Sequence, residues 1–172
     1  MKKNFIASIL FPTILFTVFI LNMNLEGSSD LNSKFEVSNE GQKGQYVNDA
    51  LWNYTIGDDI ESVAMSSDGK YIIAGSDNDE ICLFKNDSAK PIWKYKTGGD
   101  VASVAISKSG DYITAGSWDN NVYFFNRNDS KPLWNYTTAD YVNSVAISST
   151  GENIVASSSD KRLYFFNRSN AI

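Results

Sequence analysis

Short runs of apolar and polar positions follow one another after residue 50, and the whole pattern returns at an interval of 41 residues (93 − 52 and 134 − 93). Two series of aromatic residues mark the interval: Trp52, Trp93 and Trp134, and Phe84, Phe125 and Phe166. Aligned in this register, the second and third copies agree at about half of their positions. Such self-similarity predicts a repeat architecture in which one supersecondary unit is copied and stacked.

Each copy contains apolar runs of strand length, here named a, b, c and d, separated by Gly, Asn, Asp and Ser turn signals. The expected ranges are 60–65, 71–76, 81–84 and 92–95 in the first copy, 101–106, 112–117, 122–125 and a run at Trp134 in the second, and 142–147, 153–158 and 163–166 in the third. The inner strands are apolar or small on both sides, which predicts sheets covered on both faces. Gly75, Gly116 and Ser157 share one column, where small size would let a neighbouring sheet approach closely.

These patterns predict an all-β protein built from four-stranded antiparallel β-propeller blades. The expected blades are 57–97, 98–138 and 139–172, within a repeat domain of 51–172 that opens with 51–56 as a lone outer strand. Propellers typically close with about four to eight blades, so three copies predict a head-to-tail homodimer, an open arc, or part of a longer propeller. The homodimer is favoured because it leaves no strand edge unpaired.

The N-terminal region has a different composition. Residues 5–21 are almost wholly apolar and follow Lys2 and Lys3, while Glu26 and Asp30 come after them. This predicts one hydrophobic helix in 1–25, acting as a signal anchor or as a cleaved signal peptide. Residues 26–50 are rich in Ser, Asn, Gly and charge and predict a flexible linker. Under either alternative the propeller is expected outside the cell membrane, anchored through residues 5–21 or secreted.

Two motifs in the repeat resemble known families. The run Ser117-x-Asp119-x-x-Val122-x-x-Phe125 resembles the end of a WD-repeat blade, although the Gly-His pair of that family is missing. The run Lys131-Pro132-Leu133-Trp134 resembles the tryptophan strand of quinoprotein-type (PQQ-like) propeller repeats. Their combination is similar to hybrid repeats of archaeal surface proteins. The resemblance covers 51–168 and implies a β-propeller, but fold alone does not determine function.

Composition excludes several classes of catalytic and metal-binding site and argues against one class of partner. The chain has no histidine, which excludes Ser-His-Asp and Cys-His nucleophiles and imidazole metal ligands. Cys82 is the only cysteine and lies in an apolar run, so we expect a small buried hydrophobe. A net charge of −5 argues against nucleic acid as a partner. The segment Asp77-Asn78-Asp79 lacks the Gly and Glu of an EF-hand loop.

The predicted function is therefore a non-catalytic, extracytoplasmic scaffold that binds a protein or surface ligand, with no catalytic residue, cofactor or metal site assigned. Two alternatives stay open. The chain could be a fragment or subunit of a quinoprotein-like (PQQ-type) enzyme, or a structural cell-surface protein without a ligand. Visible absorbance of a bound quinone would distinguish the first, and polymeric self-association without saturable binding the second.

The candidate site is the rim on which the d–a and b–c loops are expected to meet. Its acidic residues greatly outnumber its cations: Asp58, Asp59, Asp77, Asp79, Glu80, Asp100, Asp119, Asp140 and Asp160 against Lys161 and Arg162. Trp118 breaks the repeat, because its counterparts are Asp77 and Ser159. The predicted binding residues are Trp118, Asp58, Asp100, Asp119 and Asp140. The alternatives are that the aspartates serve turns and that Trp118 packs between blades.

The sequence also contains five Asn-x-Ser/Thr acceptors for N-linked glycans, which would be usable only if the propeller is outside the cell. They begin at Asn53, Asn86, Asn128, Asn135 and Asn167.

Overall fold

The computed structural model describes residues 49–169, and all of the helix or strand structure in this range is β. Its strands are β1 (Ile60–Met65), β2 (Tyr71–Ser76), β3 (Glu80–Lys85), β4 (Trp93–Lys96), β5 (Ser103–Ile106), β6 (Tyr112–Gly116), β7 (Asn121–Asn126), β8 (Trp134–Thr137), β9 (Val142–Ile147), β10 (Asn153–Ser158) and β11 (Leu163–Asn167). The expected hydrophobic helix and almost all of the expected linker lie outside the described residues. Within 49–169, no helix is long and apolar enough to cross a membrane.

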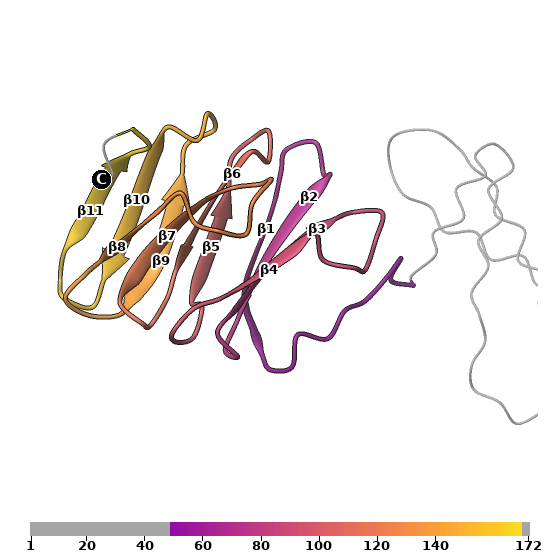
Figure 1. The fold of residues 1–172 in the computed structure, drawn as a ribbon, viewed down its shortest axis with the longest axis horizontal. Helices are drawn as coiled ribbons and strands as arrows, with labels where there is room; N and C mark the ends of the chain where they lie inside the picture. The colour runs from indigo at the N-terminus through magenta and orange to yellow at the C-terminus, as the bar shows by residue number, and fades with distance from the viewer. Residues whose placement is uncertain (1–48, 170–172) are drawn as a thin grey trace, which may run out of the picture. The chain divides into compact units, whose positions relative to one another are not determined.

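The strands form separate antiparallel sheets that follow one another along the chain. Blade 1 has the order β1-β2-β3-β4, blade 2 the order β5-β6-β7-β8, and blade 3 the order β9-β10-β11. Figure 1 shows these sheets standing side by side in chain order. The all-β expectation and the four-stranded antiparallel sheet are thus confirmed. Strand β5 begins at Ser103 rather than Val101, and the Val101 N–H donates to the Ser76 carbonyl of blade 1 (3.1 Å).

Neighbouring blades approach closely at the glycine column, as expected from the sequence. A Cβ placed on Gly75 would lie 2.5 Å from Val101 Cγ1, and one on Gly116 would lie 2.6 Å from Val142 Cγ1. Both distances are far shorter than van der Waals contact. The absence of a side chain at Gly75 and Gly116 is therefore what lets strand a of the next blade pack against strand b.

Residues 51–56 form no ladder within the described residues, so the expected lone outer strand stays a prediction. A strand needs a ladder partner, and within residues 49–169 the segment pairs with none. Its side chains nevertheless take the place of an outer strand. Trp52 stacks on Phe84 with ring centroids 5.6 Å apart, and its indole N–H donates to the Asn86 carbonyl (2.8 Å). Trp93 of β4 does the same on blade 2, with Phe125 at 5.4 Å and the Arg127 carbonyl at 2.7 Å.

Candidate functional site

Backbone hydrogen bonds bring the d–a and b–c loops together at one edge of the blades, as expected. In blade 2 the Trp118 N–H donates to the Asp100 carbonyl (2.8 Å). The equivalent bonds in blades 1 and 3 run from Asp77 to Asp59 (3.0 Å) and from Ser159 to Tyr141 (2.9 Å). We call this edge, formed by residues 57–59, 77–80, 98–100, 118–121, 139–141 and 159–162, the acidic rim.

The b–c turn of blade 2 explains why Trp118 faces outward. Ser117 is buried, and its hydroxyl accepts the Asp119 N–H (3.1 Å). Asn120 adopts the left-handed conformation (φ 72°), which Asn tolerates better than most residues. The chain therefore turns within a few residues, with Asp119 directed inward and Trp118 left at the crest of the turn.

The carboxylate of Asp119 is occupied by bonds within the protein. It accepts the Tyr123 hydroxyl (2.5 Å), the Gly98 N–H (2.8 Å) and the Asn121 N–H (2.9 Å). Burial raises the pKa of Asp119, but these hydrogen bonds outweigh it and leave the pKa below its ordinary value. Asp119 thus ties the b–c loop to strand c and to the loop before the blade. Of the predicted binding residues, it is the one most committed to holding the rim together.

Blade 3 repeats this arrangement and blade 1 replaces it. In blade 3, Asp160 accepts the Tyr164 hydroxyl (2.5 Å), which lowers the pKa of Asp160. In blade 1 the counterparts are Asn78 and Cys82, and the Asn78 amide donates to the Ile56 carbonyl instead (2.6 Å). Cys82 is fully buried, and burial raises its thiol pKa to about 11. The expectation of a buried structural cysteine is confirmed.

Trp118 forms an exposed aromatic pair with Tyr141 across the junction of blades 2 and 3. The ring centroids lie 5.6 Å apart with an interplanar angle of 21°, and the two residues are 45% and 49% exposed. Trp118 therefore packs between blades and still presents a ring to solvent. Sequence reasoning missed Tyr141. The available signal was that Tyr141 stands 41 residues after Asp100, just as Trp118 stands 41 residues after Asp77.

At the junction of blades 1 and 2, the positions equivalent to Trp118 and Tyr141 are occupied by Asp77 and Asp100. Burial raises the pKa of Asp77, and the charges of Glu61, Asp100, Asp58 and Asp59 raise it further. Within residues 49–169, the carboxylates of Asp77 and Asp100 accept no hydrogen bond and form no ion pair. An acidic junction thus lies beside an aromatic one on the same rim.

The other predicted aspartates serve turns in part. Asp58 accepts the N–H of Asp59 (3.0 Å), and Asp140 accepts the N–H of Tyr141 (2.8 Å). Both interactions are with the next residue along the chain and leave each carboxylate a second oxygen. The turn explanation therefore accounts for Asp58, Asp119 and Asp140, while it does not account for Asp77 and Asp100.

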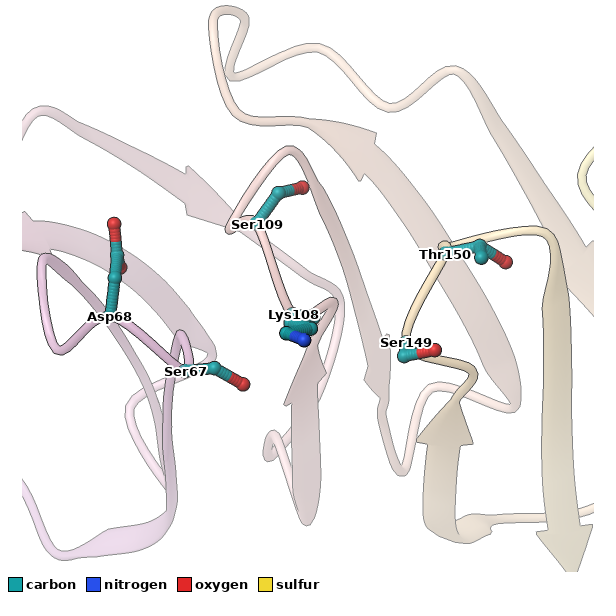
Figure 2. A pocket seen from close by; sticks show the side chains of 6 residues that line it. All are labelled: Ser67, Asp68, Lys108, Ser109, Ser149 and Thr150. Carbon is teal, nitrogen blue, oxygen red and sulfur yellow. The ribbon is translucent and has the colours of Figure 1, made fainter.

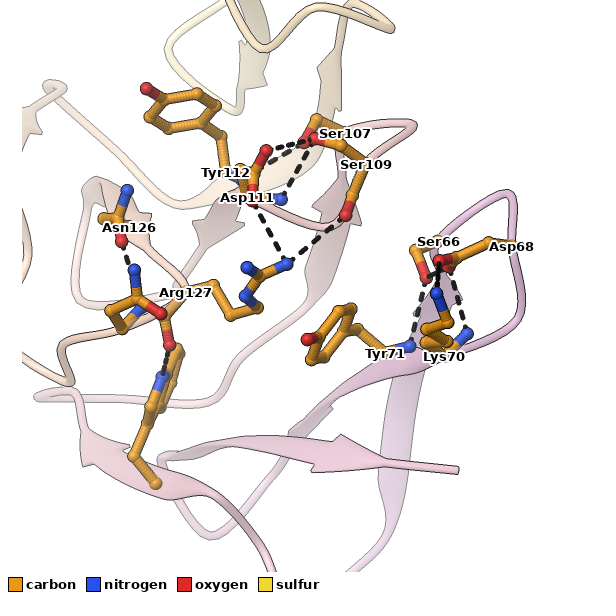
Figure 3. A network of polar contacts seen from close by, with 12 residues as sticks. Ser66, Asp68, Lys70, Tyr71, Ser107, Ser109, Asp111, Tyr112, Asn126 and Arg127 are labelled. Atoms are coloured by element: carbon orange, nitrogen blue, oxygen red, sulfur yellow. Dashed lines mark hydrogen bonds and ion pairs between the residues drawn. The ribbon is translucent and has the colours of Figure 1, made fainter. Parts of the chain in front are cut away.

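On the opposite edge of the blades, Arg127 and Lys70 interact with other side chains of the protein. Arg127 contacts Asp111 (3.1 Å), and its guanidinium lies over the Tyr71 ring of the preceding blade at 4.2 Å, as Figure 3 shows. On the same edge, the Ser66 hydroxyl and Lys70 lower the pKa of Asp68 to about 2. A shallow pocket of about 500 Å³ on this edge is lined by residues of the a–b turns, and Figure 2 shows their side chains. No residue of the acidic rim lines this pocket.

The five predicted glycan acceptors all lie within the described residues. Asn53, Asn86, Asn128 and Asn135 are exposed, and Asn167 is half-buried. Their glycosylation stays a prediction. No group of three or more His, Cys, Asp or Glu side chains within 49–169 is arranged to hold a metal ion.

Comparisons with known proteins agree on the architecture. The model of the family described as outer membrane protein assembly factor BamB, a PQQ-like repeat family, matches residues 47–171. Among solved structures, the chain is similar to one titled "Structure of U3-55K", with a TM-score of 0.60 and 17% identity. That match covers 65% of this chain and only 37% of the other, and at this identity it shows the fold alone. A search of curated proteins found no match.

Proposed function

Because the chain belongs to the family described as outer membrane protein assembly factor BamB, whose repeats are PQQ-like β-propeller blades, we propose that it is a non-catalytic, extracytoplasmic scaffold. Its ligand is a basic segment of a partner protein, and that segment binds to the acidic rim. The observation that carries the proposal is the adjacency of two junctions. Asp77 and Asp100 offer unpaired carboxylates beside Trp118 and Tyr141, which offer exposed rings.

The chemistry of the two junctions suits Arg and Lys side chains. A guanidinium or ammonium group placed between Asp77 and Asp100 would relieve the repulsion that contributes to the raised pKa of Asp77. A neighbouring cation over the Trp118 ring would gain a cation–π interaction of about 0.5–2 kcal/mol. Exposed Trp is also a frequent anchor of protein interfaces. The net charge of −5 would steer a basic partner toward the chain.

The extracytoplasmic location is supported by the sequence. Lys2 and Lys3 precede the apolar run 5–21, and positive residues are retained on the cytoplasmic side of such segments. Protease added to intact cells should digest or release the domain. Complete protection, with recovery in the cytoplasmic fraction, would overturn this part of the proposal.

The binding proposal can be tested with a fluorescein-labelled Arg-Gly repeat peptide and fluorescence anisotropy. Binding to the full-length protein should weaken as salt rises, because exposed charges are screened over about 8 Å at physiological ionic strength. The Asp77→Asn/Asp100→Asn variant should bind more weakly. Trp118→Ala should lose about 2 kcal/mol, or about 30-fold in Kd.

Matched controls make the test specific. Trp118→Phe retains an aromatic ring and should keep most of the affinity. Glu152→Gln removes one negative charge from the opposite edge and should leave the Kd unchanged. Equal binding by all of these variants would show that the acidic rim is not the site.

A further inference from the structure

Three positions of the acidic rim depart from the repeat, and all three meet at the b–c turn of blade 2. Their counterparts are Asp58 and Asp140 for Gly99, Asp77 and Ser159 for Trp118, and Asp59 and Asp100 for Tyr141. Trp118 stacks on Tyr141, and a Cβ placed on Gly99 would lie 3.3 Å from the Trp118 carbonyl carbon. The blade template requires none of these three residues. Their convergence therefore points to a ligand.

The stack with Tyr141 leaves one face of the Trp118 ring uncovered. The two rings lie nearly parallel, with an interplanar angle of 21°, so each covers one face of the other. The remaining exposure, 45% for Trp118 and 49% for Tyr141, is close to that of a ring with one free face. On its backbone side, Trp118 donates its N–H to the Asp100 carbonyl (2.8 Å). Trp118 thus lies between Tyr141, which its ring contacts, and Asp100.

Asp100 supplies a carboxylate that the protein leaves unused. The residue is half-buried, and within residues 49–169 its carboxylate accepts no hydrogen bond and forms no ion pair. Partial burial removes some of its hydration, which a charged donor from a ligand would replace. Asp119 also neighbours Trp118, but its carboxylate already accepts the Tyr123 hydroxyl and the Gly98 N–H. Asp100 is therefore the carboxylate available beside this ring.

Two glycines keep the space beside the ring free of side chains. The Gly98 N–H donates to the Asp119 carboxylate (2.8 Å), and a Cβ on Gly99 would lie only 3.0 Å from the Asp119 nitrogen. The backbone of the d–a loop therefore lies directly against the turn that carries Trp118. In the other two loops an aspartate stands at the Gly99 position. At Gly99 itself no side chain competes with a ligand for the ring.

Building on the proposed function of the acidic rim, we propose that the cation bound at Trp118 is an arginine rather than a lysine. Its guanidinium lies flat on the uncovered face of Trp118 and donates from its edge to the Asp100 carboxylate. A guanidinium is planar, stacks on aromatic rings and presents a fork of donors to a carboxylate, whereas an ammonium is a strongly hydrated point charge. One arginine can therefore make both contacts together, and the rim selects arginine-containing segments among basic ones.

Two fluorescein-labelled peptides of equal length and charge, an Arg-Gly repeat and a Lys-Gly repeat, test this selectivity. Their Kd values for the full-length protein in mild detergent would be measured by fluorescence anisotropy at one ionic strength. The wild type should bind the arginine peptide about tenfold more tightly. Trp118→Ala and Asp100→Asn should each bring the ratio of the two Kd values toward one, while Trp118→Phe should keep most of the preference.

Two further variants separate selectivity from charge. Asp58→Asn removes a charge from the rim at blade 1, so it should weaken both peptides alike and leave the ratio unchanged. Gly99→Asp introduces the residue of the other two loops, and it should lower the ratio although it adds a negative charge to the rim. Equal binding of the two peptides by the wild type, or a preference that survives both Trp118→Ala and Asp100→Asn, would overturn the arginine site and leave the proposed function standing. Failure of both peptides to bind would overturn the proposed function itself.

Discussion

Replacing Gly116 with Ala should destabilise the fold, because the added methyl group has no room between blades 2 and 3. The new Cβ would lie 2.6 Å from Val142 Cγ1 and 3.1 Å from Val145 Cγ1. Overpacking of this kind typically destabilises by about 1–3 kcal/mol. Ala is also favoured over Gly within a strand, by about 0.5–1 kcal/mol. The steric effect is the larger, and we expect a net loss of about 1–2 kcal/mol.

Urea unfolding of the full-length chain, followed by tryptophan fluorescence, measures this change. With m of about 1–3 kcal/mol/M, the midpoint should fall by roughly 0.3–2 M while m stays the same. Ser157→Ala is the matched control, because Ser157 holds the same position of the repeat in blade 3, and its effect should stay within about 0.5 kcal/mol. If Gly116→Ala were as stable as the wild type, the close approach of the blades would not be a source of stability.

Two further predictions concern the Asp119–Tyr123 pair and Cys82. Tyr123→Phe should destabilise the fold by about 1.5–3 kcal/mol, the usual contribution of a hydrogen bond to a charged group, and the more exposed pair in Tyr164→Phe should lose less. Because the pKa of Asp119 is lowered in the folded protein, its stabilisation is present above the unfolded pKa of about 3.9 and is lost as pH falls through the folded value. In Tyr123→Phe the folded pKa of Asp119 rises toward its unfolded value, so less stability should be lost on acidification, which thermal melts across the acid range would show; identical acid profiles would contradict the assignment. The Cys82 thiol, buried and with its pKa raised to about 11, should react with iodoacetamide at neutral pH only after unfolding, and rapid labelling of the native protein would contradict this.

The repeat made much of the fold predictable. The spacing of Trp52, Trp93 and Trp134 and the small residues at Gly75 and Gly116 follow from packing rules that every blade must satisfy. Residues 51–56 show that such packing rules do not by themselves predict strand pairing. The segment has the side chains of an outer strand, but strand structure requires a partner that residues 49–169 do not supply.

The site was only partly predictable, because its decisive pairs cross between loops. Asp119 and Asp100 look alike in the sequence, yet one is bonded to Tyr123 and the other accepts no hydrogen bond within 49–169. The stack of Trp118 on Tyr141 joins two different blades. Position in the repeat identifies which residues depart from the template, but three-dimensional contacts are needed to show which departures meet.

The location of the bound basic segment tests the account most directly. An Arg-Gly repeat peptide carrying a benzophenone group would be photo-cross-linked to the full-length chain, and the modified residues would be identified by mass spectrometry. The account predicts cross-links in the loops of the acidic rim, concentrated at 77–80, 98–100, 118–121 and 139–141, that disappear at high salt. Cross-links concentrated in the a–b turns at 67–69, 108–110 and 149–151, on the opposite edge, would contradict it.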